Sequence, residues 1–204
     1  INTLWQARDD LDLSAEQRRV LMLSHRSFIR AGAGLEGAAA ERMKEIKSRL
    51  AVIGTAFSQN LLADERSWFM QLSDDDLKGL PDFLIAAAKA AGAEKDLEGP
   101  VLTLSRSIIA PFLQFSPRRD LRARAYAAWV ARGANDGATD NRGLAGEMLA
   151  LRKEMADVLG YDDFASFKLE TEMAKTPDNV RDLLTSVWVP ARARAQKDAD
   201  VLTA

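Results

Sequence analysis

Apolar residues recur at helical spacing over much of the chain. The clearest row predicts a helix over residues 36–64, because its apolar positions follow steps of three or four. A shorter helix is predicted before it, starting at the capping-box pattern of Ser14 and Gln17 and ending at Gly32 and Gly34. We expect these two helices to form an antiparallel hairpin, because the connection between them is short. The long row consists of Met43, Ile46, Leu50, Ile53, Phe57 and Leu61.

Helical spacing fails in two short segments between residues 66 and 115. "SWFMQLS" (67–73) is aromatic and is followed by three aspartates, and "GPVLTLS" (99–105) has two adjacent apolar residues. Both features are typical of short strands bounded by turns. A two-stranded ribbon is marginal alone, so we expect an antiparallel pair lying on helices. Between the strands, Pro81 is predicted to open an alanine-rich helix that ends near Gly92.

The chain after residue 116 has helical patterns interrupted by one clear loop. Ser116 and Pro117 predict the start of a helix that Gly133 ends, and "GANDGATDN" (133–141) predicts a loop. Apolar residues at steps of three or four then predict a helix that ends at Gly160. That row consists of Leu144, Met148, Leu151, Met155 and Leu159.

Two further helices are predicted at the end of the chain. Asp162 is expected to cap a short helix reaching about Met173, and Thr176 with Pro177 is expected to open the last helix. Pro190 lies inside that helix, where it should kink or break it near Val189, since proline lacks a backbone N–H.

These elements predict a mainly α fold, a multi-helix bundle with helical hairpins and a small two-stranded antiparallel ribbon. We expect a helical hairpin over 1–65, a mixed segment over 66–115 and a helical segment over 116–204, with no repeat period. The chain opens at Ile1 without an initiating methionine and closes within a helical pattern, "DADVLTA". We therefore expect a piece of a longer protein.

Composition narrows the classes of function. The 28 basic and 30 acidic residues give a net charge of −2, which does not indicate a nucleic-acid partner. The absence of cysteine excludes disulfides and thiolate metal sites and fits a reducing compartment, so we expect a cytoplasmic protein. No apolar run approaches the roughly 20 residues of a membrane span, and the first residues do not resemble a signal peptide.

Two features, the segment 32–37 and His25, could belong to a cofactor or catalytic site, but the neighbouring elements or residues that such a site needs are not predicted. "GAGLEG" (32–37) matches the dinucleotide fingerprint, yet a predicted helix precedes it where a strand is required. A helix–helix corner explains it better. His25 is the only histidine, so an H-E-x-x-H zinc motif cannot occur, and no serine nucleophile is predicted on a sharp turn. We interpret His25 as a polar residue on a half-exposed helix face.

Charged clusters have similar ordinary explanations. The run Asp74–Asp76 lacks the spacing of a calcium loop, so a helix cap with a solvated turn is favoured. Glu170 and Glu172 are too close in sequence to share a helix face, which makes them a poor acid–base pair. The basic clusters are interpreted as solvated helix faces rather than nucleic-acid patches. These clusters are Arg118, Arg119, Arg122 and Arg124, followed by Tyr126 and Trp129, and separately Arg192 and Arg194.

Three blocks of sequence resemble zinc oligopeptidases of the thimet oligopeptidase type. They are "HRSFIRAGAGL" (25–35), "RLAVIGTAFSQNLLAD" (49–64) and "DNRGLAGEMLALRKEMADVLGYDDFASFKLETEMAKTPDNV" (140–180). The likeness is greatest to the bacterial peptidyl-dipeptidase (dipeptidyl carboxypeptidase) and oligopeptidase A branch. It runs along essentially the whole chain but covers only the N-terminal to middle part of a member. "LRKEMADVLGYDDFASF" is its most specific piece.

The resemblance implies a mostly helical clamshell whose deep channel admits short peptides. It also implies a zinc ion on an H-E-x-x-H helix with a further glutamate ligand, none of which occurs in this sequence. We therefore assign no catalytic, cofactor-binding or metal residue here and expect zinc only in a full-length protein. The expected partners are short peptides and a catalytic portion outside this sequence, with no nucleic acid and no membrane, and with self-association possible for the chain alone.

The leading hypothesis is a non-catalytic helical part of such a peptidase, forming part of the wall of its substrate channel. Whether it releases dipeptides or cleaves internally stays open. Two alternatives remain: a stand-alone helical peptide- or protein-binding module without activity, and an enzyme that uses His25.

Overall fold

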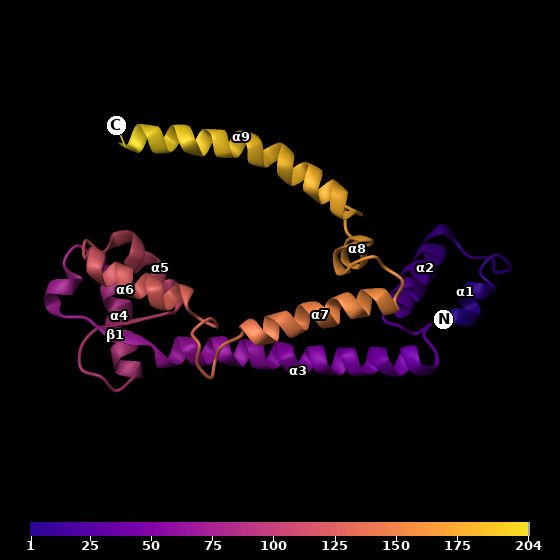
Figure 1. The fold of residues 1–204 in the computed structure, drawn as a ribbon, viewed down its shortest axis with the longest axis horizontal. Coiled ribbons are helices and arrows are strands. Elements are labelled where there is room, and N and C mark those ends of the chain that lie inside the picture. The colour runs from indigo at the N-terminus through magenta and orange to yellow at the C-terminus, as the bar shows by residue number, and fades with distance from the viewer. Residues whose placement is uncertain (204) are drawn as a thin grey trace. The chain divides into compact units, whose positions relative to one another are not determined.

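The computed structural model describes residues 1–203 and confirms a mainly α chain with one small antiparallel ribbon. Among these residues, no helix is both long enough and apolar enough to cross a lipid bilayer. In chain order the elements are α1 (Asn2–Gln6), α2 (Ala15–Arg30), α3 (Gly37–Ser67), β1 (Phe69–Gln71), the 3-10 helix η1 (Asp74–Leu77), α4 (Asp82–Glu94), β2 (Val101–Thr103), α5 (Arg106–Phe115), α6 (Arg119–Val130), α7 (Arg142–Val158), α8 (Phe164–Leu169) and α9 (Pro177–Thr203) (Figure 1).

The chain forms two compact units. Unit 1 contains Ile1–Ser48 and the chain from Leu149 onward, and unit 2 contains Arg49–Met148. The helices α3 and α7 each contribute residues to both units. The boundaries predicted at residues 65 and 115 follow the order of the elements, are not tested by this grouping, and stay a prediction.

Unit 2 has its core around the ribbon. Strand β1 pairs antiparallel with β2, as the sequence predicted, and Met70 lies opposite Leu102. The helices α4, α5 and α6 gather around the ribbon (Figure 1), and their apolar faces meet it in one cluster. Burial of this cluster stabilises a ribbon that would be marginal alone. Its buried members are Met70, Leu72, Leu80, Leu84, Ala91, Leu102, Leu104, Ile108, Ile109, Phe112, Leu121 and Ala125.

No bounds were predicted for a helix between residues 105 and 116, where the structure has α5 with Pro111 inside it. A proline in a helix removes one backbone hydrogen bond, but here Ile108, Ile109 and Phe112 are buried in the core and offset that loss. The predicted helix start at Ser116 is also wrong. Ser116 is the C-terminal cap of α5, and α6 begins at Arg119.

In unit 1, helix α2 begins with the predicted capping box. Ser14 Oγ accepts a hydrogen bond from the backbone N–H of Gln17 at 3.2 Å, and the Gln17 side chain accepts one from Ser14 N at 2.9 Å. At the following corner Gly32 has a φ of +90°, which favours glycine. The two helices meet there, where Lys47 Nζ donates to the carbonyl of Ala31 at 2.5 Å.

The long helix α3 has α7 beside it (Figure 1). Arg42 pairs with Glu154 within unit 1, and Arg49 pairs with Glu147 within unit 2. The sequence predicted α2 as the antiparallel partner of α3, whereas α2 meets α3 at their shared corner and α7 runs along it. A short connection does not fix the angle at which the chain leaves a corner, and the ion pairs with α7 are invisible to local sequence patterns.

The ends of the last two helices differ in detail from the prediction. Asp163, rather than Asp162, caps α8 by accepting a hydrogen bond from Ser166 N at 2.6 Å, and α8 ends at Leu169 rather than near Met173. Helix α9 starts at Pro177 as predicted but continues through Pro190 as one curved helix (Figure 1). This part of α9 is exposed, so water can hydrate the carbonyl that Pro190 leaves without a partner.

Candidate functional site

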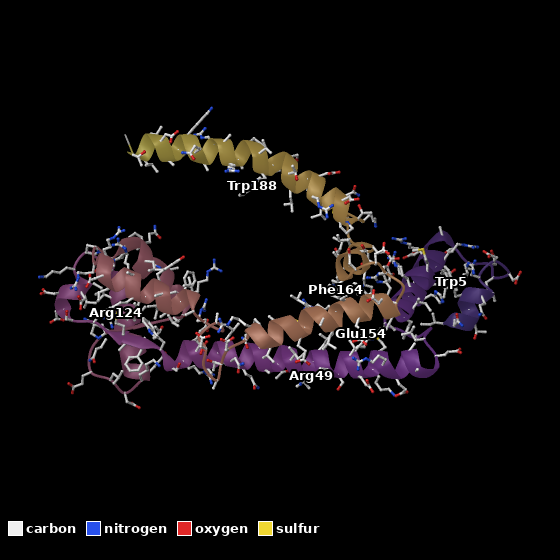
Figure 2. The ribbon with its side chains drawn as sticks, in the orientation of Figure 1. Trp5, Arg49, Arg124, Glu154, Phe164 and Trp188 are labelled. Atoms are coloured by element: carbon white, nitrogen blue, oxygen red, sulfur yellow. The ribbon has the colours of Figure 1, made fainter. Side chains whose placement is uncertain are left out.

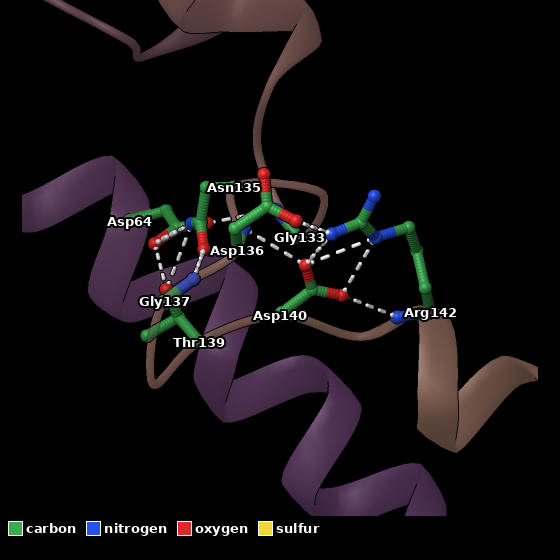
Figure 3. A network of polar contacts seen from close by, with 8 residues as sticks. All are labelled: Asp64, Gly133, Asn135, Asp136, Gly137, Thr139, Asp140 and Arg142. Carbon is green, nitrogen blue, oxygen red and sulfur yellow. Dashed lines mark hydrogen bonds and ion pairs between the residues drawn. The ribbon is translucent and has the colours of Figure 1, made fainter.

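One carboxylate fixes the loop between α6 and α7 to helix α3 (Figure 3). Asp64, near the end of α3, accepts hydrogen bonds from Gly133 N at 2.7 Å and from Asn135 Nδ2 at 2.9 and 3.0 Å. The hydroxyl of Thr139 donates to the same carboxylate. Internal donors thus surround both oxygens of Asp64, which gives this carboxylate a structural role.

A second carboxylate closes the other end of this loop (Figure 3). Asp140 accepts from the backbone N–H groups of Asp136 and Arg142, each at 2.9 Å, and from Arg142 Nε at 3.0 and 3.1 Å. The Arg142 side chain, followed by its backbone N–H, holds the pKa of Asp140 far below its usual value. Asp140 therefore stays ionised at neutral pH and is unsuited to proton transfer there.

Asn141 anchors the same loop from the buried side. Its Nδ2 donates to the carbonyl of Phe57 at 3.0 Å, and its Oδ1 accepts from Asn60 Nδ2 at 2.9 Å. Asn141 is 2% exposed, and its backbone N–H donates to Gly133 O at 2.8 Å. Since Asp64, Asp140 and Asn141 are all satisfied within unit 2, the loop predicted over 133–141 is a fixed surface rather than a reactive centre.

A second polar cluster joins α2 to the segment after α7. Arg30 donates to Phe167 O at 2.6 Å and to Tyr161 Oη at 3.2 Å, and it forms an ion pair with Glu170. Tyr161 Oη in turn donates to Glu170 at 2.6 Å. The Arg30 guanidinium also lies over the Phe167 ring, 4.2 Å from its centroid. This cluster fixes the corner at Gly160 and Tyr161 and the C-terminal end of α8.

The electrostatics of this cluster favour a structural role. The hydrogen bond from Tyr161 is the largest cause that lowers the pKa of Glu170, opposed by partial burial. Burial, followed by the hydrogen bond to Glu170, raises the pKa of Tyr161 above its usual value. Tyr161 is therefore neutral and Glu170 ionised at neutral pH, and neither is poised for acid–base exchange.

The sequence did not predict this pairing. Glu170 was considered only with Glu172, and those two residues indeed form no pair: Glu170 binds Arg30 and Tyr161. Arg30 lies 131 residues from Tyr161, so no local pattern could connect them. The sequence also gave no sign that Asp64 binds a distant loop, although Asp64 is the last residue of the block 49–64 that carries the family resemblance.

The other candidates lie apart from both clusters. The ring of His25 stacks on Trp5 with centroids 4.7 Å apart, and its Nε2 lies 3.3 Å from Asn2 Oδ1. No serine or carboxylate joins it within the residues described, as a nucleophilic site would require. The segment 32–37 is a helix–helix corner. Asp76 binds Ser73 in a cap, as the interpretation of Asp74–Asp76 expected.

The basic cluster of α6 divides into different environments. Arg118 pairs with Asp76 and Asp120, and Arg122 donates to the carbonyl of Ser116. Arg119 and Arg124 form no ion pair within residues 1–203. On α9, Arg194 pairs with Asp198 and is exposed. The structure therefore does not gather these arginines into one continuous basic surface.

A catalytic zinc ion does not fit the described residues. Zinc requires three or four close nitrogen, oxygen or sulfur ligands, usually including histidine. Within residues 1–203 no group of three His, Asp or Glu side chains could hold a metal ion, and His25 faces Trp5 and Asn2.

Comparisons with known proteins show which proteins this chain resembles in sequence. Residues 112–204 match the model of Peptidase family M3. Oligopeptidase A of Escherichia coli (strain K12) is 34% identical over 197 residues, which cover 94% of this chain and 29% of that protein. This chain is similar in sequence to M3 peptidases. Dipeptidyl carboxypeptidase of the same organism is 28% identical over 97% of this chain and 29% of that protein. Saccharolysin of Saccharomyces cerevisiae (strain ATCC 204508 / S288c) is 25% identical over 88% of this chain.

The relationship to M3 peptidases confirms the predicted resemblance. The chain aligns with the N-terminal region of these relatives and spans under a third of their length. The two polar clusters thus belong to an M3-like segment that has no metal site in its described residues.

Proposed function

We propose that this chain is a non-catalytic helical part of a zinc-dependent oligopeptidase that cleaves short peptides. The observation that carries the proposal is the alignment of 94% of the chain with the N-terminal region of oligopeptidase A. In this proposal zinc and its ligands belong to a portion outside this sequence. The chain contributes a wall of the substrate channel, which limits the size of substrates and excludes water during hydrolysis.

The surface of α9 supports a role as part of a larger assembly. All side chains from Arg181 to Thr203 are exposed, including that of Trp188, which is 65% exposed (Figure 2). A helix with an apolar row on a fully exposed surface normally has a partner that covers the row. We propose that the catalytic portion of the longer protein covers it, and that the chain alone covers it by self-association. The row consists of the exposed Leu183, Leu184, Val187 and Trp188, preceded by the half-buried Val180.

Two further points belong to the same proposal. The substrates are short peptides because the relatives are named oligopeptidases and a dipeptidyl carboxypeptidase. The compartment is the cytoplasm, in keeping with the lack of cysteine and with one relative named a probable cytosolic oligopeptidase A.

The experiment compares this chain with a longer product of the same gene. Chain 1–204 and the product read past the codon for Ala204 are purified and incubated with an internally quenched short peptide, with and without a zinc chelator. We expect hydrolysis only by the longer product, abolished by the chelator and unchanged by His25→Ala. Chelator-sensitive hydrolysis by chain 1–204 itself would contradict the proposal, as would a longer product without such activity.

A stand-alone binding module is the second candidate, and the exposed row of α9 favours it. It predicts that chain 1–204 binds short peptides without cleaving them and that Trp188→Ser weakens this binding. Calorimetric titration of chain 1–204 and of its Trp188→Ser variant with the same peptide separates the two candidates. Only the binding-module candidate expects peptide binding that Trp188→Ser weakens.

A further inference from the structure

A shallow hollow of about 450 Å³ lies between α5 and α6 in unit 2. It combines two arginines with apolar and aromatic side chains, and its lining residues are Leu113, Arg119, Arg122, Ala123 and Tyr126. Neither of the two polar clusters described above contributes a residue to it. The hollow is therefore a separate feature of the surface.

The spacing of the lining residues explains why they share one surface. Positions 119, 122, 123 and 126 are three or four residues apart and so occupy one face of a helix. Leu121 and Ala125 occupy another face of α6 and are buried in the core. Tyr126 is 55% exposed because the core fixes α6 through those residues and leaves this face in water.

The charges of this face are not neutralised. The nearby carboxylate of Asp120 binds Arg118, whose hydrogen bond lowers the pKa of Asp120 to about 2. Arg119 forms no ion pair in the part of the chain that the structure describes. Arg122 donates to the carbonyl of Ser116, which orients its guanidinium without neutralising it. Two guanidinium groups thus line the hollow without a carboxylate partner.

We infer that this hollow binds an acidic side chain of a peptide, with an adjacent apolar side chain lying against Leu113 and Tyr126. Guanidinium groups bind carboxylates through paired, charge-assisted hydrogen bonds. A nucleic acid would require a longer row of cations, and Arg118 is already occupied by two aspartates. The inference concerns the chain itself and does not depend on which side of a peptidase the hollow faces.

The test is a titration of ¹⁵N-labelled chain 1–204 with the peptide acetyl-Gly-Leu-Glu-Leu-Gly-amide, followed by amide chemical shifts. Blocked ends leave the glutamate as the only carboxylate of the probe. We expect saturable shifts at Arg119, Arg122, Ala123 and Tyr126. Arg119→Glu should weaken binding about tenfold or more, since a charge-assisted contact is replaced by repulsion. Arg124→Glu is the matched control, because it makes the same charge change on the same helix outside the hollow.

Several results would overturn the inference. Equal weakening by Arg119→Glu and Arg124→Glu would show general charge attraction instead of a site. Equal binding of the probe with glutamine in place of glutamate would remove the role of the carboxylate. Tighter binding at these amides by a peptide with a free C-terminal carboxylate and no acidic side chain, or by an oligonucleotide, would assign the hollow to another ligand. Circular dichroism of both variants verifies that each remains helical.

Discussion

Arg49 on α3 donates to both carboxylate oxygens of Glu147 on α7, at 2.6 Å from Nε and 2.8 Å from Nη2. Arg42 and Glu154 repeat this geometry at 2.6 and 2.9 Å. The two arginines are seven residues apart, as are the two glutamates, which places each set on one face of its helix after two turns. Paired hydrogen bonds of this kind fix direction as well as distance, so they favour α7 as the antiparallel neighbour of α3.

The thermal stability of the chain should depend on positions 49 and 147 carrying opposite charges, whichever of the two positions carries the positive one. Arg49→Glu is expected to lower the thermal midpoint of chain 1–204, since two carboxylates would then face each other. Arg49→Glu combined with Glu147→Arg should restore most of the loss, and added salt should reduce the difference, because both side chains are exposed. Differential scanning fluorimetry of the original chain and the variants measures these thermal midpoints. A double variant no more stable than the single one would show that the pair has no directional role.

The Tyr161–Glu170 hydrogen bond should shape stability in acid. The folded-state pKa of Glu170 lies below its unfolded value, so Glu170 stabilises the fold above the unfolded pKa. That stabilisation is lost as the pH falls through the folded pKa. Tyr161→Phe removes the largest cause of the lowered pKa, so the variant should lose less stability than the original chain between pH 7 and pH 3.

Urea unfolding at several pH values measures this difference. Tyr126→Phe is the control, because the Tyr126 side chain is exposed and outside the Arg30 cluster. Tyr161 should also affect the stability of the fold at alkaline pH. Its raised pKa gives stability below the unfolded value near 10 that is lost as the pH rises through the folded pKa. An unchanged acid profile in Tyr161→Phe would contradict the proposed coupling.

Two glycine substitutions should have opposite effects. Gly133 has a φ of +67°, and a Cβ there would meet Asn141 Nδ2 and Leu61 Cδ2, each at 3.0 Å. Gly133→Ala should therefore lower the free energy of unfolding by about 1–2 kcal/mol. Gly146 lies in α7 with nothing within 4 Å of a built Cβ, so Gly146→Ala should raise it by about 1 kcal/mol. Urea denaturation measures the free energy of unfolding of both variants. Equal changes in Gly133→Ala and Gly146→Ala would contradict the geometry of the loop.

Asp64 should hold the loop in place. Asp64→Ala removes the acceptor for Gly133 N, Asn135 and Thr139, and it should cost about 1–3 kcal/mol of unfolding free energy. Hydrogen exchange at the Gly133 amide should become faster in the variant. Asp74→Ala, which changes an exposed aspartate in η1, is the matched control. If both variants behave alike, the carboxylate of Asp64 does not order the loop.

The exposed row of α9 should control association rather than stability. Trp188→Ser is expected to change the unfolding free energy by less than about 0.5 kcal/mol, because the ring is already in water. It should nevertheless reduce self-association in analytical ultracentrifugation and reduce the binding of an apolar dye. Trp129→Ser should instead destabilise the chain by about 2 kcal/mol, because Trp129 packs against the core of unit 2. A monomeric original chain with no dye binding would contradict the role given to α9.

Local chemistry explains which elements could be predicted. The capping box at Ser14, the apolar row of α3 and the turn at Gly160 depend on residues a few positions apart, so their spacing in sequence is their spacing in the structure. Helix α5, whose bounds were not predicted, and the unbroken helix at Pro190 show where such rules fail. Burial outweighed the cost of Pro111, and the exposure of α9 leaves the carbonyl freed by Pro190 open to solvent.

The candidate site was less predictable for a related reason. Carboxylates are common on helix surfaces, so neither Asp64 nor Glu170 differs in sequence from a solvated residue. Their partners are 69 and 140 residues away. Only a folded chain reveals that these carboxylates hold a loop and a corner.

The sequence by itself determined the helical class, the ribbon, most helix ends and the resemblance to M3 peptidases, because these depend on local spacing and motif order. The tertiary structure decided that α7 accompanies α3, that Arg30 binds Tyr161 and Glu170, and that Arg119 and Arg122 share a hollow without a carboxylate. The physical reason is that the direction in which a chain leaves each corner depends on long-range packing, and that direction sets which distant charges meet.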